Sequence, residues 1–330
     1  MKKYLPDYVD LETIEGKVSK SLINPYYEIL TIPTKLFKQK ADVYHALTPN
    51  VAIYLSLLKN TVTTIHDLAD INDRQGMIEN RYLKFFFNQA MKSQKLIAVS
   101  KLTKQKILEN FPLSKDKIVV INEGVENRFK PLKKRKKGFI KIGYLGGFGK
   151  RRRIYNLFRL AEILEADYPK FKFKVYLYGK SKFKKEKRIF VNDDGTFSEK
   201  NYFVKNNEFL PYSKNIEIKG FVKESVMVKI YNSFDFFFFP SAYEGFSYPI
   251  LEAQACGIPT FIMSDAKIPE ETTKKCIKCD TLDEIAKKIV KLSKNKKAYN
   301  KISKECSRYV KKFDWKECIR KTVELYETIH

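Results

Sequence analysis

The sequence has few cysteines, few histidines and no long apolar run. Its five cysteines are an odd number at irregular spacing, which excludes a disulfide framework and favours a reducing compartment. Cys276 and Cys279 form a lone C-x-x-C motif, so we expect small residues in a surface loop rather than a zinc or redox site. No stretch reaches about 18 apolar residues, and Met1-Lys2-Lys3 is not followed by an apolar signal core. We therefore expect a cytoplasmic protein that neither spans a membrane nor is exported.

Acidic residues are also few compared with basic residues. The chain has 64 lysines and arginines against 38 aspartates and glutamates, a formal net charge of +26. A charge of this size implies anionic partners, which are nucleotide phosphates, an acidic lipid surface or nucleic acid. The length of 330 residues predicts two domains, and the 44% hydrophobic content predicts that each has its own core.

Short apolar segments alternate with helical patterns from residue 29 onward, which predicts an α/β protein with parallel sheets covered on both faces. In the first half the expected strands are 29–32, 42–46, 61–65, 95–99 and 118–121, and the expected helices are 50–59, 80–94 and 101–110. In the second half, the alternation in 171–178 predicts a half-exposed strand. Residues 180–213 are charged, and we expect a loop-like insertion there.

Residues 234–271 are the most informative stretch of the chain. The aromatic run from Phe234 to Phe239 predicts a buried strand that delivers the chain to a loop at its carboxyl end. After that loop, Ser247 is expected to cap a helix that Pro249 starts and Gly257 ends. Chemistry is expected in the turn between strand and helix.

Two glutamates bracket this turn, with Glu244 in the loop and Glu252 about one turn inside the helix. The backbone N–H groups of Gly245, Phe246 and Ser247 are expected to point between them. A helix start holds anionic oxygens, and carboxylates accept hydrogen bonds from hydroxyls. A nucleoside diphosphate sugar carries both kinds of group. A plainer interpretation stays open, in which the glutamates cap a buried αβ unit and face solvent.

This stretch closely resembles the Glu-x7-Glu signature of family 4 retaining glycosyltransferases, which have the GT-B fold. The matching residues are Pro240, Ser241, Glu244, Gly245, Phe246, Ser247, Pro249, Leu251, Glu252, Ala253, Ala255, Cys256, Gly257 and Pro259. The resemblance implies two facing Rossmann-like domains with a cleft between them. It also implies transfer of a sugar from a nucleotide-sugar donor to a glycan, lipid or other acceptor, with retention of anomeric configuration. The alternative is a GT-B-like protein that binds a nucleotide sugar or a partner without turnover.

Two of the three histidines, His45 and His66, follow expected strands, at the edge of an α/β sheet where ligands bind. An isolated histidine is more often a hydrogen-bonded structural residue. The resemblance distinguishes His66, because it lies in a T-x-H-D-L stretch whose histidine reaches the donor sugar in the family. Ser100 is expected to cap the helix that follows the next strand.

Gly146 and Gly147 follow a strand at 140–145 and predict a loop that cradles phosphate, although glycines alone are a weak signal. Family members place a basic pair before the next helix to neutralise the donor diphosphate, and Arg151 and Arg152 fit that position. Gly147 stands where the family often has arginine, which implies that this cation is either lost or moved to Lys150. The sequence has no recognisable Asp-x-Asp loop, so we expect no metal, and no cofactor beyond the nucleotide-sugar substrate.

The resemblance assigns Glu244 and His66 to the donor sugar and Glu252 to the ribose hydroxyls. The expected domains are an acceptor-side domain at 1–130, a basic linker at 131–138, a nucleotide-sugar domain at 139–312, and a terminal helix at 313–330 that crosses back to the first domain. The linker contains five consecutive cations, Lys133 to Lys137. Two interpretations stay open for this run: a solvated linker, and a contact with acidic lipid headgroups that would make the protein peripheral at a membrane. The expected partners are the donor, a glycan or lipid-linked acceptor and an acidic membrane surface, but not nucleic acid.

Overall fold

A computed structural model provides the fold, and two compact units divide the chain. Unit 1 comprises Met1–Gly124 with Phe313–His330, and unit 2 comprises Val125–Lys312. The structure describes residues 4–14, 32, 34–36, 38, 40–55, 57–68, 77–111, 115–133, 138–180, 184–191, 197–205, 208–211 and 213–329. Most of the basic run at 133–137 therefore lies outside the described residues, as does the expected strand at 29–32 except for Ile32, which is helical.

Unit 1 contains a parallel sheet, which has four strands among the described residues and the order β1-β2-β3-β4. Its strands are β1 (Tyr44–Ala46), β2 (Thr61–Ile65), β3 (Lys95–Ala98) and β4 (Ile118–Val120). Its helices are α3 (Met77–Ala90), α4 (Lys101–Asn110) and α11 (Trp315–Glu327), with 3₁₀ turns η2 (Pro49–Leu55) and η3 (Lys115–Lys117). The expected strands at 42–46, 61–65, 95–99 and 118–121 are confirmed, because short β-branched runs suit a sheet buried on both faces.

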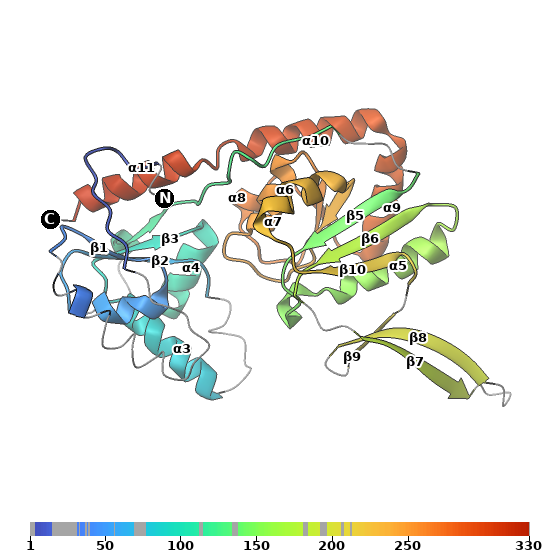
Figure 1. The fold of residues 1–330 in the computed structure, drawn as a ribbon, viewed down its shortest axis with the longest axis horizontal. Helices are drawn as coiled ribbons and strands as arrows, with labels where there is room; N and C mark the ends of the chain where they lie inside the picture. Colours follow the sequence, from blue (N-terminus) through green and yellow to red (C-terminus); the bar gives the residue numbers. More distant parts are fainter. Residues whose placement is uncertain are drawn as a thin grey trace. The chain divides into compact units, whose positions relative to one another are not determined.

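The two faces of this sheet are covered by different helices, as Figure 1 shows. Leu96 of β3 packs in a buried cluster with Ile107 of α4. The next residue, Ile97, points to the opposite face and packs with Cys318 and Leu325 of α11. Successive side chains of a strand point to opposite faces, so the alternation along β3 divides the apolar core into two layers.

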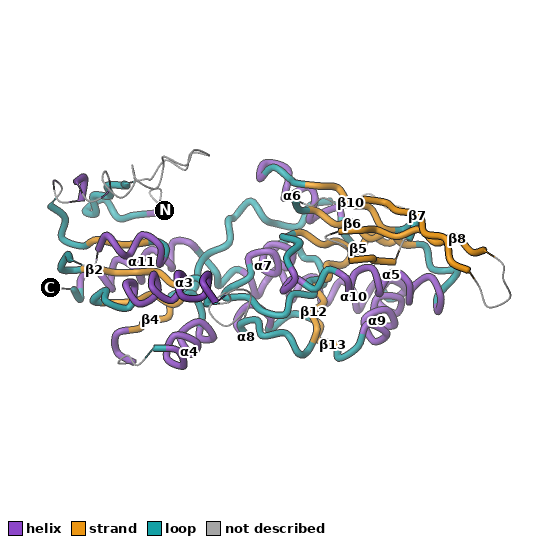
Figure 2. Tube along the Cα trace, turned by 90° about the horizontal axis from the view of Figure 1, so that it is seen from below, coloured by secondary structure: helices purple, strands orange, loops and turns teal. Residues whose placement is uncertain are grey.

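Unit 2 contains a parallel sheet with the strand order β10-β6-β5-β11-β12-β13. Its strands are β5 (Ile140–Leu145), β6 (Phe173–Tyr178), β10 (Ile216–Gly220), β11 (Phe236–Phe238), β12 (Thr260–Met263) and β13 (Ile277–Cys279). Its helices are α5 (Tyr155–Asp167), α6 (Glu224–Ser233), α7 (Tyr248–Ala255), α8 (Glu270–Thr273), α9 (Leu282–Lys294) and α10 (Lys296–Val310), with a 3₁₀ turn η4 (Lys150–Arg152). Figure 2 shows α5 and α9 on one side of this sheet and α6 on the other.

Three expectations about unit 2 were wrong. Strand β6 is not half-exposed but lies between β10 and β5. Its Val175 and Leu177 side chains are fully buried, whereas lysine and tyrosine side chains are long enough to carry their polar ends out of the core. The segment expected as a loop-like insertion contains a three-stranded antiparallel sheet of β7 (Lys184–Val191), β8 (Phe197–Lys205) and β9 (Glu208–Pro211). Cys279 is buried in β13 rather than placed in a surface loop, and none of the five cysteines, all of which lie in the described residues, forms a disulfide.

The boundary between the units lies at Gly124, earlier than the expected end of the first domain at residue 130. Side chains of α6 contact the segment after this boundary, and Glu224 forms an ion pair with Arg128. Asn232 accepts a hydrogen bond from the Leu132 N–H at 2.8 Å and donates one to the Lys130 carbonyl at 3.1 Å. These bonds attach the start of the expected linker to unit 2.

No described helix is long and apolar enough to cross a membrane.

Candidate functional site

Two neighbouring strands of unit 2, β5 and β11, deliver loops to the same edge of the sheet. From β5 the chain proceeds to β6 and β10 on one side, whereas from β11 it proceeds to β12 and β13 on the other. The chain therefore reverses its direction across the sheet between these two strands, which pair directly with each other. Ligands of open α/β sheets bind at the carboxyl ends of the strands where the order reverses.

The loops after β5 and β11 are joined by hydrogen bonds and an ion pair. The Ala242 N–H donates to the Arg151 carbonyl at 2.8 Å. The Arg152 guanidinium pairs with Glu244 Oε1, and the Ser241 hydroxyl donates to the same carboxylate oxygen at 2.6 Å. The structure thus brings together Arg152 and Glu244, two predicted site residues that lie far apart in the sequence. Ser241 was part of the signature, but sequence reasoning assigned it no role.

The Glu244 carboxylate is nearly removed from solvent, with 6% of the residue exposed. Its second oxygen, Oε2, has no hydrogen-bond partner among the residues that the structure describes, so it can accept a hydrogen bond from a ligand hydroxyl. The Arg152 guanidinium also lies 5.5 Å from the centre of the Phe239 ring. The ion pair and this ring fix the arginine at the strand end.

The second glutamate of the turn, Glu252 in α7, has a different environment. The Tyr231 hydroxyl of α6 donates to its Oε2 atom at 2.7 Å. Burial raises the pKa of Glu252 to about 7, against the opposing effect of the tyrosine hydrogen bond. Tyr231 is fully buried, and its ring packs edge-on against Phe129, Phe234 and Phe237. No sequence pattern connects a tyrosine of one helix to a glutamate of another, so this partner was missed.

Gly245, Phe246 and Ser247 are buried and lead into α7, but Ser247 does not cap the helix as expected. Its backbone is left-handed, with φ 77° and ψ 71°, whereas a capping serine has extended backbone angles. The Ser247 hydroxyl is buried and has no hydrogen-bond partner among the described residues. A strained, unsatisfied serine at the start of a helix is typical of a ligand-binding turn.

The glycine loop after β5 is closely packed on one side. The Gly146 N–H donates to the Tyr178 carbonyl at 3.0 Å, and a Cβ atom on Gly179 would lie 2.0 Å from the Gly146 carbonyl oxygen. The Tyr144 hydroxyl donates to the Gly147 carbonyl, whereas a Cβ on Gly147 would meet no atom within 4 Å. Space is therefore open at Gly147, the predicted phosphate contact.

In unit 1, His66 follows β2 and has hydrogen-bond acceptors at both ring nitrogens. Nε2 lies 3.0 Å from the Leu47 carbonyl oxygen, and Nδ1 lies 3.3 Å from Glu123 Oε1. The hydrogen bond to Glu123 raises the pKa of His66, whose side chain is 45% exposed. The arrangement favours a protonated ring. No sequence pattern connects Glu123 to this histidine, so the contact was missed.

His45 lies within β1 rather than after it, and it is a structural residue. Its Nδ1 atom lies 2.5 Å from the Tyr326 hydroxyl of α11, and its Nε2 atom lies 2.8 Å from Thr64 Oγ1. Burial lowers the pKa of His45 to about 4, so the ring is neutral at physiological pH. The expected cap at Ser100 is confirmed, since its side chain accepts from the Thr103 N–H.

Among the described residues, no group of three or more histidine, cysteine or acidic side chains could hold a metal ion. The acidic side chains of the site instead contact arginine, serine and tyrosine.

Comparison with known proteins gives matches over both units. The family model "Glycosyl transferases group 1" matches residues 125–309, and "Glycosyltransferase Family 4" matches residues 4–128. A relative from Escherichia coli, the O-antigen chain mannosyltransferase B, is 23% identical over 306 residues, which cover 88% of this chain and 75% of that protein.

Solved structures show the same fold at low sequence identity. A glycosyltransferase from Rickettsia africae is 18% identical, with a TM-score of 0.65 and coverage of 97% of this chain and 84% of that one. The Anabaena protein HepE, solved in complex with UDP-glucose, is 14% identical, with a TM-score of 0.67 and coverage of 92% and 84%. The two parallel sheets with their covering helices are those of the GT-B fold.

Proposed function

This chain belongs to the glycosyl transferases group 1 family, and from that premise we propose that it transfers a sugar from a nucleotide-sugar donor to a glycan or lipid-linked acceptor with retention of configuration. The observation that carries the proposal is the cluster of Arg152, Glu244 and Ser241, which joins two loops where the strand order reverses. The UDP-glucose complex of HepE supports a nucleotide sugar as donor. The name of the Escherichia coli relative supports a glycan acceptor.

In this proposal, different residues bind the diphosphate, the ribose and the sugar of the donor. Arg151 and Arg152 hold the diphosphate, because a guanidinium has five N–H donors and can bind Glu244 and phosphate oxygens together. Glu252 accepts hydrogen bonds from the ribose hydroxyls. The second oxygen of Glu244 accepts from a hydroxyl of the donor sugar, and His66 contributes a further contact to that sugar.

The proposed reaction breaks the bond between the sugar and the diphosphate. Negative charge grows on the leaving phosphate, and fixed positive groups such as Arg152 stabilise it more in the transition state than in the bound donor. The acceptor hydroxyl attacks on the same face with help from that phosphate, so we assign no protein nucleophile. Because two arginines and the start of α7 supply the positive charge, we propose that turnover needs no divalent metal.

The experiment is an assay of purified protein with a panel of nucleotide sugars and an acceptor extract. We expect release of nucleoside diphosphate that depends on the acceptor, a product with the donor's anomeric configuration by NMR, and activity that survives EDTA. Donor binding without acceptor-dependent release would support the non-catalytic alternative. An inverted product, or activity that EDTA abolishes and manganese restores, would contradict the mechanism.

A further inference from the structure

Helix α10 carries a row of cations on its solvent face. Its exposed members are Lys297, Lys301, Lys304, Arg308 and Lys311. They are separated alternately by four and three residues, so they lie on one stripe of the helix. Lys311 is the C-cap residue and keeps helical backbone angles. At 1.5 Å per residue, the stripe is roughly 21 Å long.

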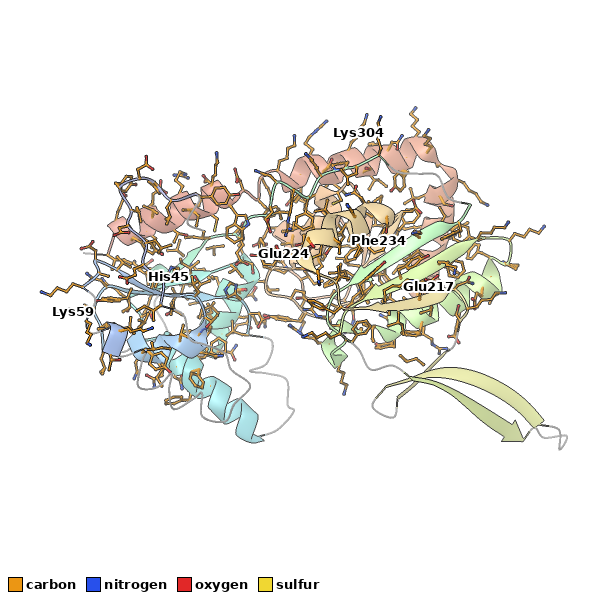
Figure 3. The ribbon with its side chains drawn as sticks, viewed as in Figure 1. His45, Lys59, Glu217, Glu224, Phe234 and Lys304 are labelled. Atoms are coloured by element: carbon orange, nitrogen blue, oxygen red, sulfur yellow. The ribbon has the colours of Figure 1, made fainter. Side chains whose placement is uncertain are left out.

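The opposite face of α10 attaches the helix firmly to unit 2. Cys306 and Val310 are buried there. The Tyr299 hydroxyl donates to the Asp235 carbonyl at 2.9 Å, and the Tyr309 hydroxyl donates to the Glu271 carbonyl at 2.8 Å. Figure 3 shows Lys304 at the outer edge of the helix. The cations therefore form a fixed and exposed surface.

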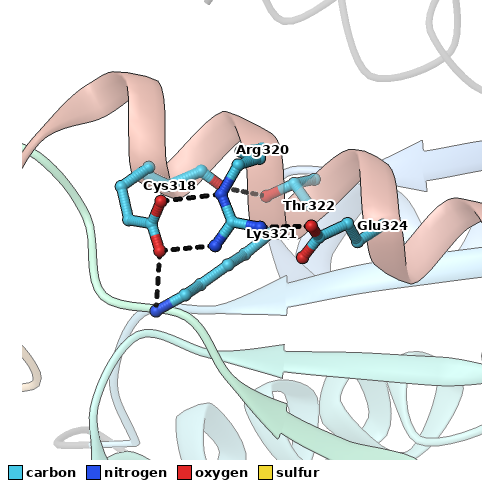
Figure 4. Close-up of polar contacts among 6 residues, drawn as sticks. Cys318, Arg320, Lys321, Thr322 and Glu324 are labelled. Atoms are coloured by element: carbon cyan, nitrogen blue, oxygen red, sulfur yellow. Dashed lines mark hydrogen bonds and ion pairs between the residues drawn. The ribbon is translucent and has the colours of Figure 1, made fainter.

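None of the five cations forms an ion pair with any residue that the structure describes. Helix α11 is also amphipathic, but there Arg320 pairs with Glu317 and with Glu324, and Lys321 pairs with Glu317. Figure 4 shows this network. Charges on α11 are thus balanced within the helix, whereas those on the α10 stripe are not, and like charges at this spacing repel one another. An anionic partner would relieve that repulsion.

We propose that the α10 stripe docks unit 2 on the surface of an anionic lipid bilayer. A straight row of this length is too long for a nucleotide phosphate and suits an extended negative surface. Four of its five members are lysines, which act as hydrated point charges rather than forks for individual phosphates. The tyrosines of the helix do not offer an open ring to a base: Tyr299 packs edge-on against Phe236, and the Lys312 ammonium lies over the Tyr309 ring. Attraction to acidic lipid therefore explains the stripe better than single-stranded nucleic acid does.

The test compares two triple variants of the full chain that remove the same charge from unit 2. The first combines Lys297→Gln, Lys301→Gln and Lys304→Gln. The matched control combines Lys170→Gln, Lys172→Gln and Lys214→Gln, which are exposed elsewhere on the unit and form no ion pair with the described residues. Binding is measured by co-sedimentation with phosphatidylcholine vesicles, with and without phosphatidylglycerol.

We expect the α10 variant to bind the acidic vesicles roughly 100-fold more weakly than the wild type, since each of the three basic residues near such a surface contributes about a fivefold step. The control should stay close to the wild type, and salt should weaken wild-type binding. Unchanged melting temperature and unchanged turnover on a soluble acceptor show that the α10 variant is folded.

Three outcomes would overturn the proposal. Equal losses in both triple variants would show that only net charge matters. Retained vesicle binding in the α10 variant, with loss on neutralising Lys133 to Lys137, would transfer the role to the linker. Retained vesicle binding combined with lost binding of a single-stranded RNA would identify the stripe as a nucleic-acid surface instead.

Discussion

The two glutamates of the signature turn lie eight residues apart, and their surroundings differ. Glu244 is held by a guanidinium and a hydroxyl at the same oxygen. Glu252 is held by one tyrosine hydroxyl in an apolar cluster, where burial raises its pKa to about 7. Both are glutamates of one motif, but the elements packed against each carboxylate decide which partners it has.

The two histidines of unit 1 repeat this contrast. His66 has a carboxylate beside it, which raises its pKa, whereas His45 is enclosed by α11 and the strands, which lowers its pKa. His45 lies in β1, and His66 directly follows the neighbouring strand β2. A position at a sheet edge therefore does not by itself distinguish a candidate ligand-binding histidine from a structural one.

The largest expected effect comes from removing the partner of Glu244. Arg152→Ala should lower turnover about 100- to 1,000-fold, which corresponds to the loss of one charge-stabilising donor, with a smaller effect on donor binding. Arg152→Lys should be intermediate, because lysine keeps the charge and loses the planar fork. Steady-state kinetics check both variants, and a larger effect on KM than on kcat would contradict the role.

This variant also leaves a buried carboxylate without its cation, which destabilises the fold. The double variant Arg152→Ala with Glu244→Gln is the control for that loss. If its melting temperature recovers while its turnover is lower than that of Glu244→Gln alone, the arginine has a role beyond holding Glu244.

The second effect concerns His45. The unfolded chain protonates this residue below about pH 6.5, but the folded chain does so only near pH 4. The folded state therefore loses stability as pH falls through this window, by up to about 3 kcal/mol, and the loss levels off below it. Urea unfolding of the wild type and of His45→Gln, measured across the window, should give a difference that depends on pH. A parallel pair of curves would contradict a neutral, buried ring.

Glu252→Ala should weaken binding of the nucleotide by about 1.5–3 kcal/mol, because two ribose hydroxyls lose a charged acceptor. Calorimetry measures this directly, and an unchanged affinity would remove Glu252 from the proposed site. Because ribose hydroxyls favour the ionised carboxylate, wild-type binding should tighten as pH rises through about 7.

The smallest effect is expected for Tyr231→Phe, which keeps the buried ring and removes the hydroxyl that holds Glu252. Affinity should fall by about 1 kcal/mol at neutral pH. The pH at which binding tightens should rise, since the lost hydrogen bond favoured the ionised carboxylate. A purely structural tyrosine would change stability and leave that pH unchanged.

Local signals predicted much of this protein. Strand β2 and helix α4 occupy the expected residues, since short β-branched runs and a serine cap act within a few residues of chain. The same kind of signal failed at Ser247, where the loop imposes a left-handed backbone on a residue that otherwise caps well. It also failed for the antiparallel sheet of β7 to β9, because charged residues that suggest a loop can equally occupy a solvated strand.

The sequence by itself determined the family, the α/β class and the residue types gathered around the signature turn, because these depend on motif and periodicity along the chain. Only the tertiary structure decided that Arg152 meets Glu244, that Tyr231 meets Glu252 and that His45 meets Tyr326. Each of these pairs joins separate elements, and its geometry follows from strand order and helix packing. Burial in the folded protein shifts the pKa values of Glu252 and His45, and no local pattern of residues encodes burial.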